Sequence, residues 1–139
     1  MSLRFLLDTN VVSEPRRPRP NAKLVARLVE YEAEVAIAAP TWHELWYGCY
    51  RLPLSARRAS LDFYLTTAIG AAMPILPYDD RAAVWQARER ARLTTLGKPP
   101  GFVDAQIAAV AVTNELALVT LNLADYRDFA ELKLVDWAK

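Results

Sequence analysis

Short apolar segments alternate along this chain with longer segments in which apolar residues recur at helical spacing. The apolar segments predict buried strands over residues 3–7, 35–38, 73–76, 117–119 and 132–135. The longer segments predict helices over residues 10–14, 21–32, 40–52, 55–69, 79–97 and 102–114. Strands that alternate with helices favour a three-layer α/β/α domain around a mostly parallel sheet.

Proline, glycine and aspartate mark several of the predicted boundaries. The stretch Pro15–Pro20 is basic and rich in proline, which predicts a stiff loop because proline fixes φ and cannot continue a helix. Gly70 is predicted to lie just past the end of a helix. Asp79 or Asp80 is expected to cap the helix that runs to about residue 97.

A length of 139 residues is typical of one domain, and the sequence has no repeat, low-complexity tract or linker. Both features predict a single domain over residues 1–139. Apolar residues make up 53% of the chain, which is enough for a sizeable core. The formal net charge of +1 excludes a strongly basic surface over the whole chain. A local basic stripe, however, is sufficient for an enzyme that acts on a nucleic acid.

Cys49 is the single cysteine and His43 the single histidine. One cysteine excludes an intrachain disulfide, and the pair is too small a set for a Cys/His zinc site. The N-terminal residues become charged too early for a signal peptide, and no apolar run is long enough for a membrane span. These features predict a soluble protein of the reducing cytoplasm, in which Cys49 is a small packing residue.

Acidic side chains stand at the ends of the predicted strands and helices. Asp8 ends the first strand, Glu44 lies in the first turn of the helix after the second strand, and Asp104 begins the helix before the fourth. The fourth strand is followed by Thr120, Asn122 and Asp125. Ligands of open parallel sheets bind beyond the carboxyl ends of the strands, so we expect these side chains to form one carboxylate pocket.

Carboxylates that lie close together repel one another. At about 4 Å and an effective dielectric constant near 20, one such pair costs roughly 4 kcal/mol. A bound cation offsets this repulsion, and oxygen ligands select hard ions, which predicts Mg²⁺ with Mn²⁺ as a substitute. Such an ion lowers the pKa of a bound water and polarises a phosphoryl group, which indicates metal-dependent hydrolysis.

Each acid also has a simpler interpretation in terms of local structure. Thr41 and Glu44 match a helix capping box, Asp104 lies where a helix dipole favours an anion, and Asp8 is suited to start a turn or cap a helix. The joint placement favours a site. Asp8 follows an apolar strand and Asp104 heads an apolar helix, and neither has a basic partner nearby in the sequence.

Four short motifs carry these residues in order. They are Leu6–Glu14 with Asp8, Thr41–Gly48 with Glu44, Asp104–Ala109, and Leu118–Asn122 followed by Asp125 and Tyr126. In this order and at these distances the motifs resemble those of the PIN-domain family, and within it the VapC-type toxins of bacterial type II toxin–antitoxin pairs. The resemblance covers essentially the whole chain, and the proline-rich insert after Glu14 is similar to that of the subgroup related to FitB.

The resemblance implies four or five parallel strands between helices, and a Mg²⁺-dependent endoribonuclease that hydrolyses RNA. It also implies a homodimer, or a larger assembly with the small antitoxin that neutralises the toxin. Some relatives carry a further acid at the position of Asn122, where this chain has an amide. The site is therefore three acids plus an amide, and the number of metal ions stays open between one and two.

The expected roles in the site follow from the residue types. Asp8 and Asp104 are expected to hold the ion, and Glu44 to be a third ligand or to orient the attacking water. Hydrogen bonds to the carboxylates or to the scissile phosphate are expected from Thr9, Thr120 and Asn122, with Asp125 as a further supporting acid. Asn10 is expected to cap the short helix that follows it.

Basic and aromatic residues outside the acidic motifs have two interpretations each. The loop arginines either contact the RNA backbone or are simply solvated; they are Arg16, Arg17 and Arg19. His43 precedes Glu44, but neighbours on a helix point about 100° apart, which argues against a shared site. The helix around Glu44 also carries Trp42, Trp46, Tyr47 and Tyr50. They indicate either core packing or a groove or dimer surface on which a partner helix docks.

Other functions fit the sequence less well. A haloacid-dehalogenase-like phosphatase needs a second aspartate where this chain has Asn10, and a phosphotransfer receiver needs a lysine after the fourth strand. A subunit of a DNA-binding toxin–antitoxin complex with little turnover and a housekeeping RNA-processing nuclease remain alternatives. No helix-turn-helix is present, and no motif identifies the RNA target.

Overall fold

Five parallel strands form one sheet in the computed structural model, which describes residues 2–139. The strands are β1 (Phe5–Leu7), β2 (Val35–Ala38), β3 (Ile75–Leu76), β4 (Ala117–Val119) and β5 (Leu134–Val135). Their order across the sheet is β3-β2-β1-β4-β5, and each neighbouring pair runs parallel. The predicted strands are confirmed, but β1, β3 and β5 are shorter than predicted because only their last residues pair with a neighbour.

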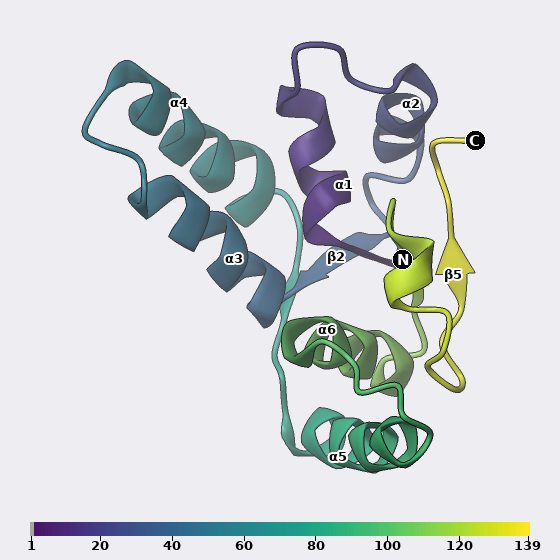
Figure 1. Cartoon of the computed structure of the whole chain (residues 1–139). Helices are drawn as coiled ribbons and strands as arrows, with labels where there is room; N and C mark the ends of the chain where they lie inside the picture. The colour runs from purple at the N-terminus through teal and green to yellow at the C-terminus, as the bar shows by residue number, and fades with distance from the viewer. Residues whose placement is uncertain (1) are drawn as a thin grey trace.

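Helices connect these strands, as Figure 1 shows. They are α1 (Thr9–Ser13), α2 (Ala22–Glu30), α3 (Ala39–Tyr50), α4 (Ala56–Tyr64), α5 (Asp80–Thr95) and α6 (Phe102–Thr113). Short 3₁₀ turns occupy Glu14–Arg16 (η1) and Leu123–Asp125 (η3), and a π-helical segment, Leu65–Gly70 (η2), continues α4. The cap predicted for α5 is confirmed, because the carboxylate of Asp79 accepts from the backbone N–H of Ala82 at 3.0 Å. No helix within residues 2–139 is long and apolar enough to cross a membrane.

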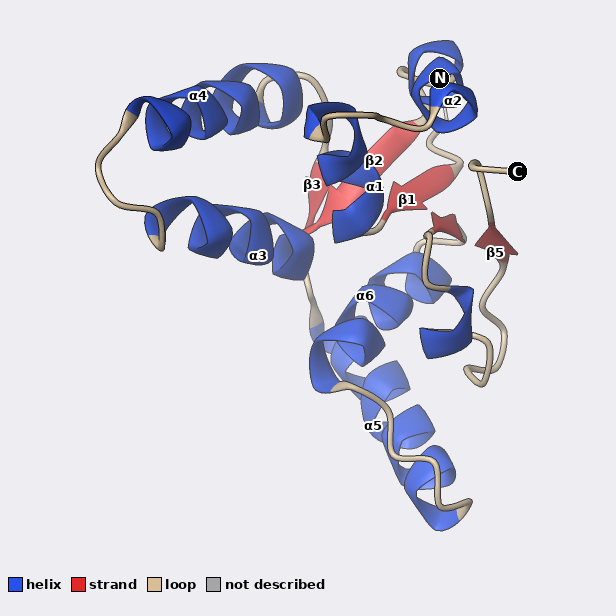
Figure 2. Cartoon of the chain, turned by 45° about the horizontal axis from the view of Figure 1, so that its top comes forward, coloured by secondary structure: helices blue, strands red, loops and turns tan. Residues whose placement is uncertain are grey.

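The sheet lies between two layers of helices (Figure 2). Leu6, Ala36 and Leu118 belong to the core that α5 and α6 cover, whereas Leu7, Ile37 and Val119 belong to the core beneath α1, α2, α3 and α4. Successive side chains of a strand point to opposite faces, so a strand buried on both sides must be apolar throughout. This arrangement is the three-layer α/β/α fold with a parallel sheet that the sequence predicts.

The strand order reverses between β1 and β4. From β1 the chain builds the sheet in one direction through β2 to β3, and it then returns through α5 and α6 to place β4 on the other side of β1. The connections on the two sides leave a crevice beyond the carboxyl ends of β1 and β4. In open α/β sheets this position is where ligands bind.

Gly70 does not end a helix in the way the sequence predicts. It is the last residue of the π-helical segment, and Gly97, not Gly70, has a left-handed φ of 75°. A Cβ atom on Gly70 would lie 3.0 Å from the Cη2 atom of Trp42. The glycine is required by the close packing of α3 against the segment after α4, and the prediction of a C-terminal cap is wrong.

Candidate active site

Asp8 lies directly after β1, and only 6% of its surface is exposed. Its Oδ1 atom accepts from the backbone N–H of Thr9 at 2.8 Å, which makes Asp8 the N-cap of α1. Its Oδ2 atom accepts from the hydroxyl of Thr120 at 2.8 Å. Thr120 follows β4, so this hydrogen bond joins the ends of the two strands at which the sheet order reverses. Asp8 is thus both a helix cap and a buried carboxylate at the crevice.

Asn10 does not cap α1, because Asp8 already holds that position. Its side-chain oxygen accepts from the backbone N–H of Leu121 at 3.2 Å, and its amide donates to Oδ2 of Asp8 at 3.4 Å. Asn10 therefore connects the start of α1 to the chain that leaves β4. The prediction of its capping role is wrong, but the residue lies in the site.

Asp104 lies in the first turn of α6, as predicted, with Gly101 as the residue before the helix. Its Oδ1 atom accepts from the hydroxyl of Tyr126 at 3.1 Å. A Cβ atom on Gly101 would lie 3.2 Å from Oδ2 of Asp104, so a larger residue there would press on the carboxylate. The carboxylate is held from one side by Tyr126 and borders the glycine on the other.

Glu44 lies in the second turn of α3, not in the first, because the helix begins at Ala39 with Ala38 as its N-cap. Thr41 is buried within the helix, and its hydroxyl has no hydrogen-bond partner among residues 2–139. The alternative interpretation of Thr41 and Glu44 as a capping box is therefore wrong. The side chain of Glu44 is half-buried and is not used to cap a helix.

The three acids border one open cavity beyond the carboxyl ends of β1 and β4. Its lining consists of Asp8, Thr9, Asn10, Glu44, Val103, Asp104, Ile107 and Asn122. Within the part of the chain that the structure describes, no ion pair joins Asp8, Glu44 or Asp104 to a basic side chain. The structure therefore brings the three acids to the lining of one cavity, and their joint role as a site stays a prediction.

Burial raises the pKa of both aspartates above the ordinary value for this residue. For Asp8 the hydrogen bonds from the Thr120 hydroxyl and the Thr9 backbone oppose the effect of burial without cancelling it. For Asp104, burial is again the largest cause, and the negative charges of Asp8, Asp125 and Glu44 add to it. The folded protein thus resists placing these charges together.

This donor set fits a divalent cation. As the side chains are arranged, no three His, Cys, Asp or Glu residues within 2–139 converge closely enough to enclose an ion. Mg²⁺ does not require such a cage, because it keeps several water molecules and binds proteins through one or two carboxylates. Asp8 and Asp104 offer carboxylate oxygens of raised pKa in a cavity whose charge a cation would offset.

The supporting residues divide into two groups. Thr9 and Asn122 line the cavity, and Thr120 lies beneath it with its hydroxyl shared between Asp8 and the backbone N–H of Asn122. Asp125 instead lines a neighbouring cavity beside Asp104, together with Lys98 and Asp128. Its charge still raises the pKa of both aspartates, but it does not take the place of Asn122.

Tyr126 is the residue of this site to which the sequence assigns no role. Only 1% of its surface is exposed, and its hydroxyl reaches Asp104 from beneath the cavity, close to Asp8. Burial, followed by the nearby charges of Asp8 and Asp104, raises the pKa of Tyr126, so the hydroxyl keeps its proton and donates it to a hydrogen bond. No periodicity indicates this position, because it lies in an irregular segment after η3.

The segment with the loop arginines follows the last residue of α1, whereas Asp8 caps its first residue. Figure 1 shows this segment between α1 and α2. Arg16 stacks over the ring of Tyr64 at 5.3 Å and contacts Ser60, whereas Arg17 pairs with the buried Glu14 at 3.3 Å. Glu14 also accepts from the backbone N–H of Asn21 at 2.8 Å, which folds the loop back onto the protein. Their contact with RNA, like that of Arg19, stays a prediction.

The aromatic residues of α3 split between core and surface. Trp42 and Trp46 pack against the core beneath α1 to α4, whereas Tyr47 and Tyr50 are 54% and 58% exposed. His43 is exposed and does not line the acidic cavity, which agrees with the 100° that separates it from Glu44. Cys49 is fully buried in the core, as predicted.

A second and more apolar cavity lies away from the acids, between α2 and the π-helical segment η2. Its lining includes Val25, Leu28, Val29, Ile69 and Met73. Such a lining suits apolar side chains of a partner rather than a metal ion or a phosphate. It is separate from the carboxyl ends of β1 and β4, and the chemistry of the three acids does not involve it.

Comparisons with known proteins agree with this geometry. The PIN domain profile matches residues 5–132. Toxin FitB of Neisseria gonorrhoeae is 36% identical over 128 residues, which cover 88% of this chain and 90% of the relative. The tRNA(fMet)-specific endonuclease VapC of Shigella flexneri is 29% identical over 136 residues, which cover 98% and 99%.

A solved structure of FitAB bound to the IR36 DNA fragment has the same fold. It superposes with a TM-score of 0.89 and 30% sequence identity over 97% of this chain and 96% of that one. The profile match, the curated relatives and this superposition agree on one assignment. The chain belongs to the PIN domain family, in the group that contains the FitB and VapC toxins.

Proposed function

We propose that this protein is the toxin of a toxin–antitoxin pair and a Mg²⁺-dependent endoribonuclease that hydrolyses phosphodiester bonds. The observation that carries the proposal is the cavity that Asp8, Glu44 and Asp104 border at the carboxyl ends of β1 and β4. PIN-domain nucleases use a divalent metal, and the oxygen ligands of this cavity favour Mg²⁺, or Mn²⁺ in its place.

In this proposal Asp8 and Asp104 hold the ion, and Glu44 is a third ligand or orients the attacking water. When bound, the cation lowers the pKa of a coordinated water and offsets charge on the phosphate. Thr120 and the Thr9 backbone keep the carboxylate of Asp8 in one orientation, through the two 2.8 Å hydrogen bonds. Fixed ligands are the contribution that a protein makes to such a site.

We also propose that a small antitoxin binds and neutralises this toxin, and that the toxin acts on RNA in the cytoplasm as a homodimer or within a larger complex. The relative solved as FitAB on DNA supports an assembly of this kind. The apolar cavity between α2 and η2 is a suitable surface for antitoxin side chains, and Val29 in its lining is 66% exposed. Partly exposed apolar surface of this kind is typical of sites where another protein binds.

A second candidate function is that of a subunit in a DNA-bound toxin–antitoxin complex with little turnover. The observation behind it is that the solved relative FitAB is bound to a DNA fragment. Enzymatic turnover is better supported here, because capping α1 accounts for Asp8 alone, whereas three acids without basic partners among residues 2–139 border one cavity at a cost in stability. A housekeeping nuclease would share the same cavity. The neighbouring reading frame distinguishes it, since a toxin is expected to have a short antitoxin frame beside it.

The decisive experiment measures RNA cleavage by the purified protein with Mg²⁺ or Mn²⁺, and with a chelator. Asp8→Asn and Asp104→Asn are expected to lower the cleavage rate at least about 100-fold with the fold intact, because each removes a charged ligand of the cation. Asp62→Asn is the matched control, since Asp62 is an exposed acid of α4 outside the cavity. Full activity of Asp104→Asn in Mg²⁺, or cleavage that survives the chelator, would show that the proposal is wrong.

A further inference from the structure

One face of α3 carries a stacked column of exposed side chains. The rings of His43 and Tyr47 lie 6.3 Å apart at an interplanar angle of 21°, and the guanidinium of Arg51 lies over the ring of Tyr47 at 5.1 Å. These residues are spaced by four, so the column spans about 12 Å along the helix. Tyr47 is 54% exposed, and His43 and Arg51 are exposed as well.

A second aromatic–arginine pair lies on the other side of the acidic cavity. The guanidinium of Arg90, on α5, lies over the ring of Phe102 at 5.4 Å, and Phe102 is 54% exposed at the first position of α6. The backbone of Phe102 is held in place by Gln86, whose amide donates to the Phe102 carbonyl at 3.2 Å. Gln86 is itself buried and accepts from the hydroxyl of Tyr78.

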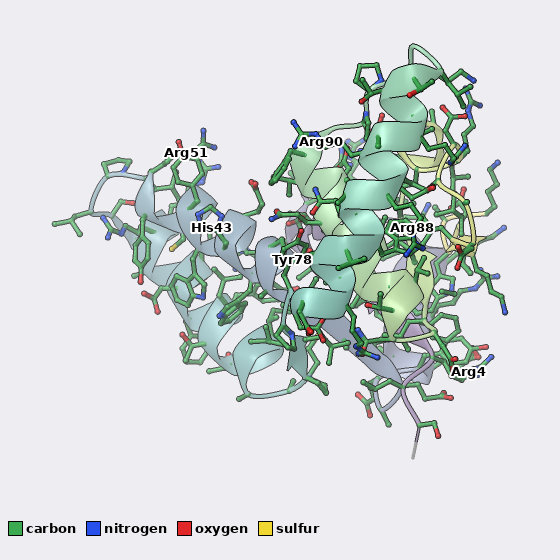
Figure 3. The ribbon with its side chains drawn as sticks, turned by 90° about the horizontal axis from the view of Figure 1, so that it is seen from below. Arg4, His43, Arg51, Tyr78, Arg88 and Arg90 are labelled. Carbon is green, nitrogen blue, oxygen red and sulfur yellow. The ribbon has the colours of Figure 1, made fainter. Side chains whose placement is uncertain are left out.

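Each aromatic–arginine pair has its aromatic residue on a helix that also contributes an acid to the lining of the cavity. Glu44 forms one wall and precedes Tyr47 by one turn of α3, while Asp104 forms another and follows Phe102 within the first turn of α6. In Figure 3, His43 and Arg51 project from α3 at the upper left and Arg90 projects from α5 at the upper centre, on the same side of the molecule. Arg88 lies on the opposite side of α5.

The charge of the cavity makes flanking cations useful. Three carboxylates repel the phosphates of an approaching RNA, and this repulsion acts over a Debye length of about 8 Å at physiological ionic strength. A guanidinium that stacks on a ring still has N–H groups free for phosphate oxygens, and the aromatic ring offers a surface to a base. Exposed aromatic rings beside arginines are the usual elements of single-strand binding.

We propose that the Tyr47–Arg51 and Phe102–Arg90 pairs bind single-stranded RNA on either side of the scissile phosphate, with bases stacked on the rings and phosphates on the guanidiniums. His43 extends the α3 surface by one further turn toward the start of the helix. This inference rests on the proposed ribonuclease function. It assigns RNA binding to arginines beside the acids, rather than to the loop arginines, because Arg16 is hydrogen-bonded to Ser60 and Arg17 is paired with Glu14.

The test uses a fluorescently labelled single-stranded RNA and the full chain carrying Asp104→Asn, so that binding is measured without cleavage. In that background, Tyr47→Ala and Phe102→Ala are each expected to weaken binding at least about fivefold, because base stacking on an aromatic ring is lost. Arg51→Ala and Arg90→Ala are each expected to reduce the slope of log affinity against log salt by about 0.7, because each removes one phosphate contact.

Matched controls lie on the same protein. Arg88→Ala removes an exposed arginine from the other side of α5, and Phe63→Ala removes an aromatic residue of α4 that is 71% exposed. Neither change is expected to alter RNA affinity. In the cleaving protein, the Tyr47 and Phe102 changes are expected to raise KM more than they lower kcat, because they act on substrate binding.

Three outcomes would overturn the inference. RNA affinity that is unchanged in the Arg51→Ala/Arg90→Ala double variant would do so, as would an equal loss in Arg88→Ala. Sedimentation that shows Tyr47→Ala or Phe102→Ala converting a dimer to a monomer would instead identify these rings as an interface between two copies. If the unaltered protein does not cleave RNA with any divalent cation, the proposed function itself fails, which is a separate result.

Discussion

At the scale of single residues, the candidate site gathers groups that oppose folding. Asp8 and Asp104 are carboxylates whose pKa is raised by burial, yet each receives hydrogen bonds that keep it in one orientation. Thr120 serves Asp8 in this way, and Tyr126 serves Asp104. A protein tolerates such groups where it uses them, and oriented ligands bind a cation better than mobile ones.

Tyr126→Phe tests the contribution of the hidden hydroxyl. The ring stays packed, but Asp104 loses the donor at 3.1 Å that fixes its rotamer. We expect the affinity for Mn²⁺, measured by titration calorimetry, to fall about tenfold, as it does when an outer hydrogen bond to a metal ligand is removed. The melting temperature is expected to change little.

Tyr64→Phe is the matched control for this experiment. Tyr64 also donates a hydrogen bond from a partly buried phenol, at 2.9 Å, but its acceptor is the backbone carbonyl of Val12. It is expected to cost some stability and to leave Mn²⁺ affinity unchanged. Equal Mn²⁺ affinity in the Tyr126 variant and the unaltered protein would refute a positioning role for Tyr126.

At the scale of elements, α3 links the active site to the hairpin that it forms with α4. Its first half carries Glu44 beside the cavity, and Trp42 packs against the π-helical segment at Gly70. Its second half extends away from the sheet, as Figure 2 shows, and carries the exposed Tyr47 and Tyr50. The position of Glu44 therefore depends on how closely α3 and the segment after α4 approach one another.

Two glycines test this packing with the same substitution. At Gly70 a Cβ atom would meet Trp42 at 3.0 Å and the carbonyl oxygen of Leu65 at 3.3 Å, whereas at Gly48 it would meet no atom within 4 Å. We expect Gly70→Ala to destabilise the protein by about 1–3 kcal/mol through overpacking. Gly48→Ala is expected to stabilise α3 by about 0.5–1 kcal/mol, because alanine has the higher helix propensity.

Urea unfolding of both variants gives these free energies directly. The two changes in the free energy of unfolding are expected to have opposite signs, because Gly70 lacks space for a methyl group and Gly48 does not. A stabilising effect of Gly70→Ala would show that Trp42 is free to move, and that the contact does not hold α3 in place. The RNA-cleaving activity of Gly70→Ala is expected to fall with its stability, since Glu44 lies on the same helix.

At the scale of the whole molecule, the parallel sheet brings distant parts of the chain to one crevice. β1 and β4 are neighbours although more than a hundred residues separate them, and the hydrogen bond from Thr120 to Asp8 follows from that pairing. Bringing the acidic side chains together lowers the free energy of unfolding of the protein. Because the size of this effect depends on the protonation of the acids, it can be measured from the dependence of stability on pH.

Asp104→Asn is expected to be more stable than the unaltered, metal-free protein at pH 7. The pKa of Asp104 is raised in the folded state, so its ionised form opposes folding at neutral pH, and this cost disappears as pH falls toward the unfolded pKa of about 3.9. The difference in melting temperature between the two proteins should therefore shrink as pH is lowered from 7 to about 4. Bound Mn²⁺ should also reduce this difference in melting temperature at pH 7. The ion stabilises the unaltered protein more than the variant, because only the unaltered protein has the full ligand set.

Calorimetry across this pH range measures the difference. Below about pH 4 both proteins are expected to lose stability together. The lowered pKa of Asp79 follows from its backbone hydrogen bond to Ala82, and that of Glu89 from its contact with Arg92, so protonation removes both contributions. A difference that does not change with pH would show that the charge of Asp104 has no cost in the fold.

Local patterns in the sequence were sufficient for much of the fold. Apolar segments bounded by turn residues located all five strands, and helical spacing located the helices to within a few residues, because these signals depend on near neighbours in the chain. The same reasoning placed Asp8 after β1 and Asp104 in the first turn of α6. Their identification as a pair rested on the absence of basic residues nearby.

The tertiary structure decided what depends on long-range contacts. Capping motifs alone assigned Thr41 and Asn10 to roles that the packing of α3 and the cap at Asp8 exclude. Only the pairing of β1 with β4 brings Thr120 to Asp8, and only the fold of the C-terminal segment places Tyr126 beneath Asp104. A sequence pattern reports the preference of a segment for helix or strand, whereas contacts between distant segments follow from burying both faces of one sheet at once.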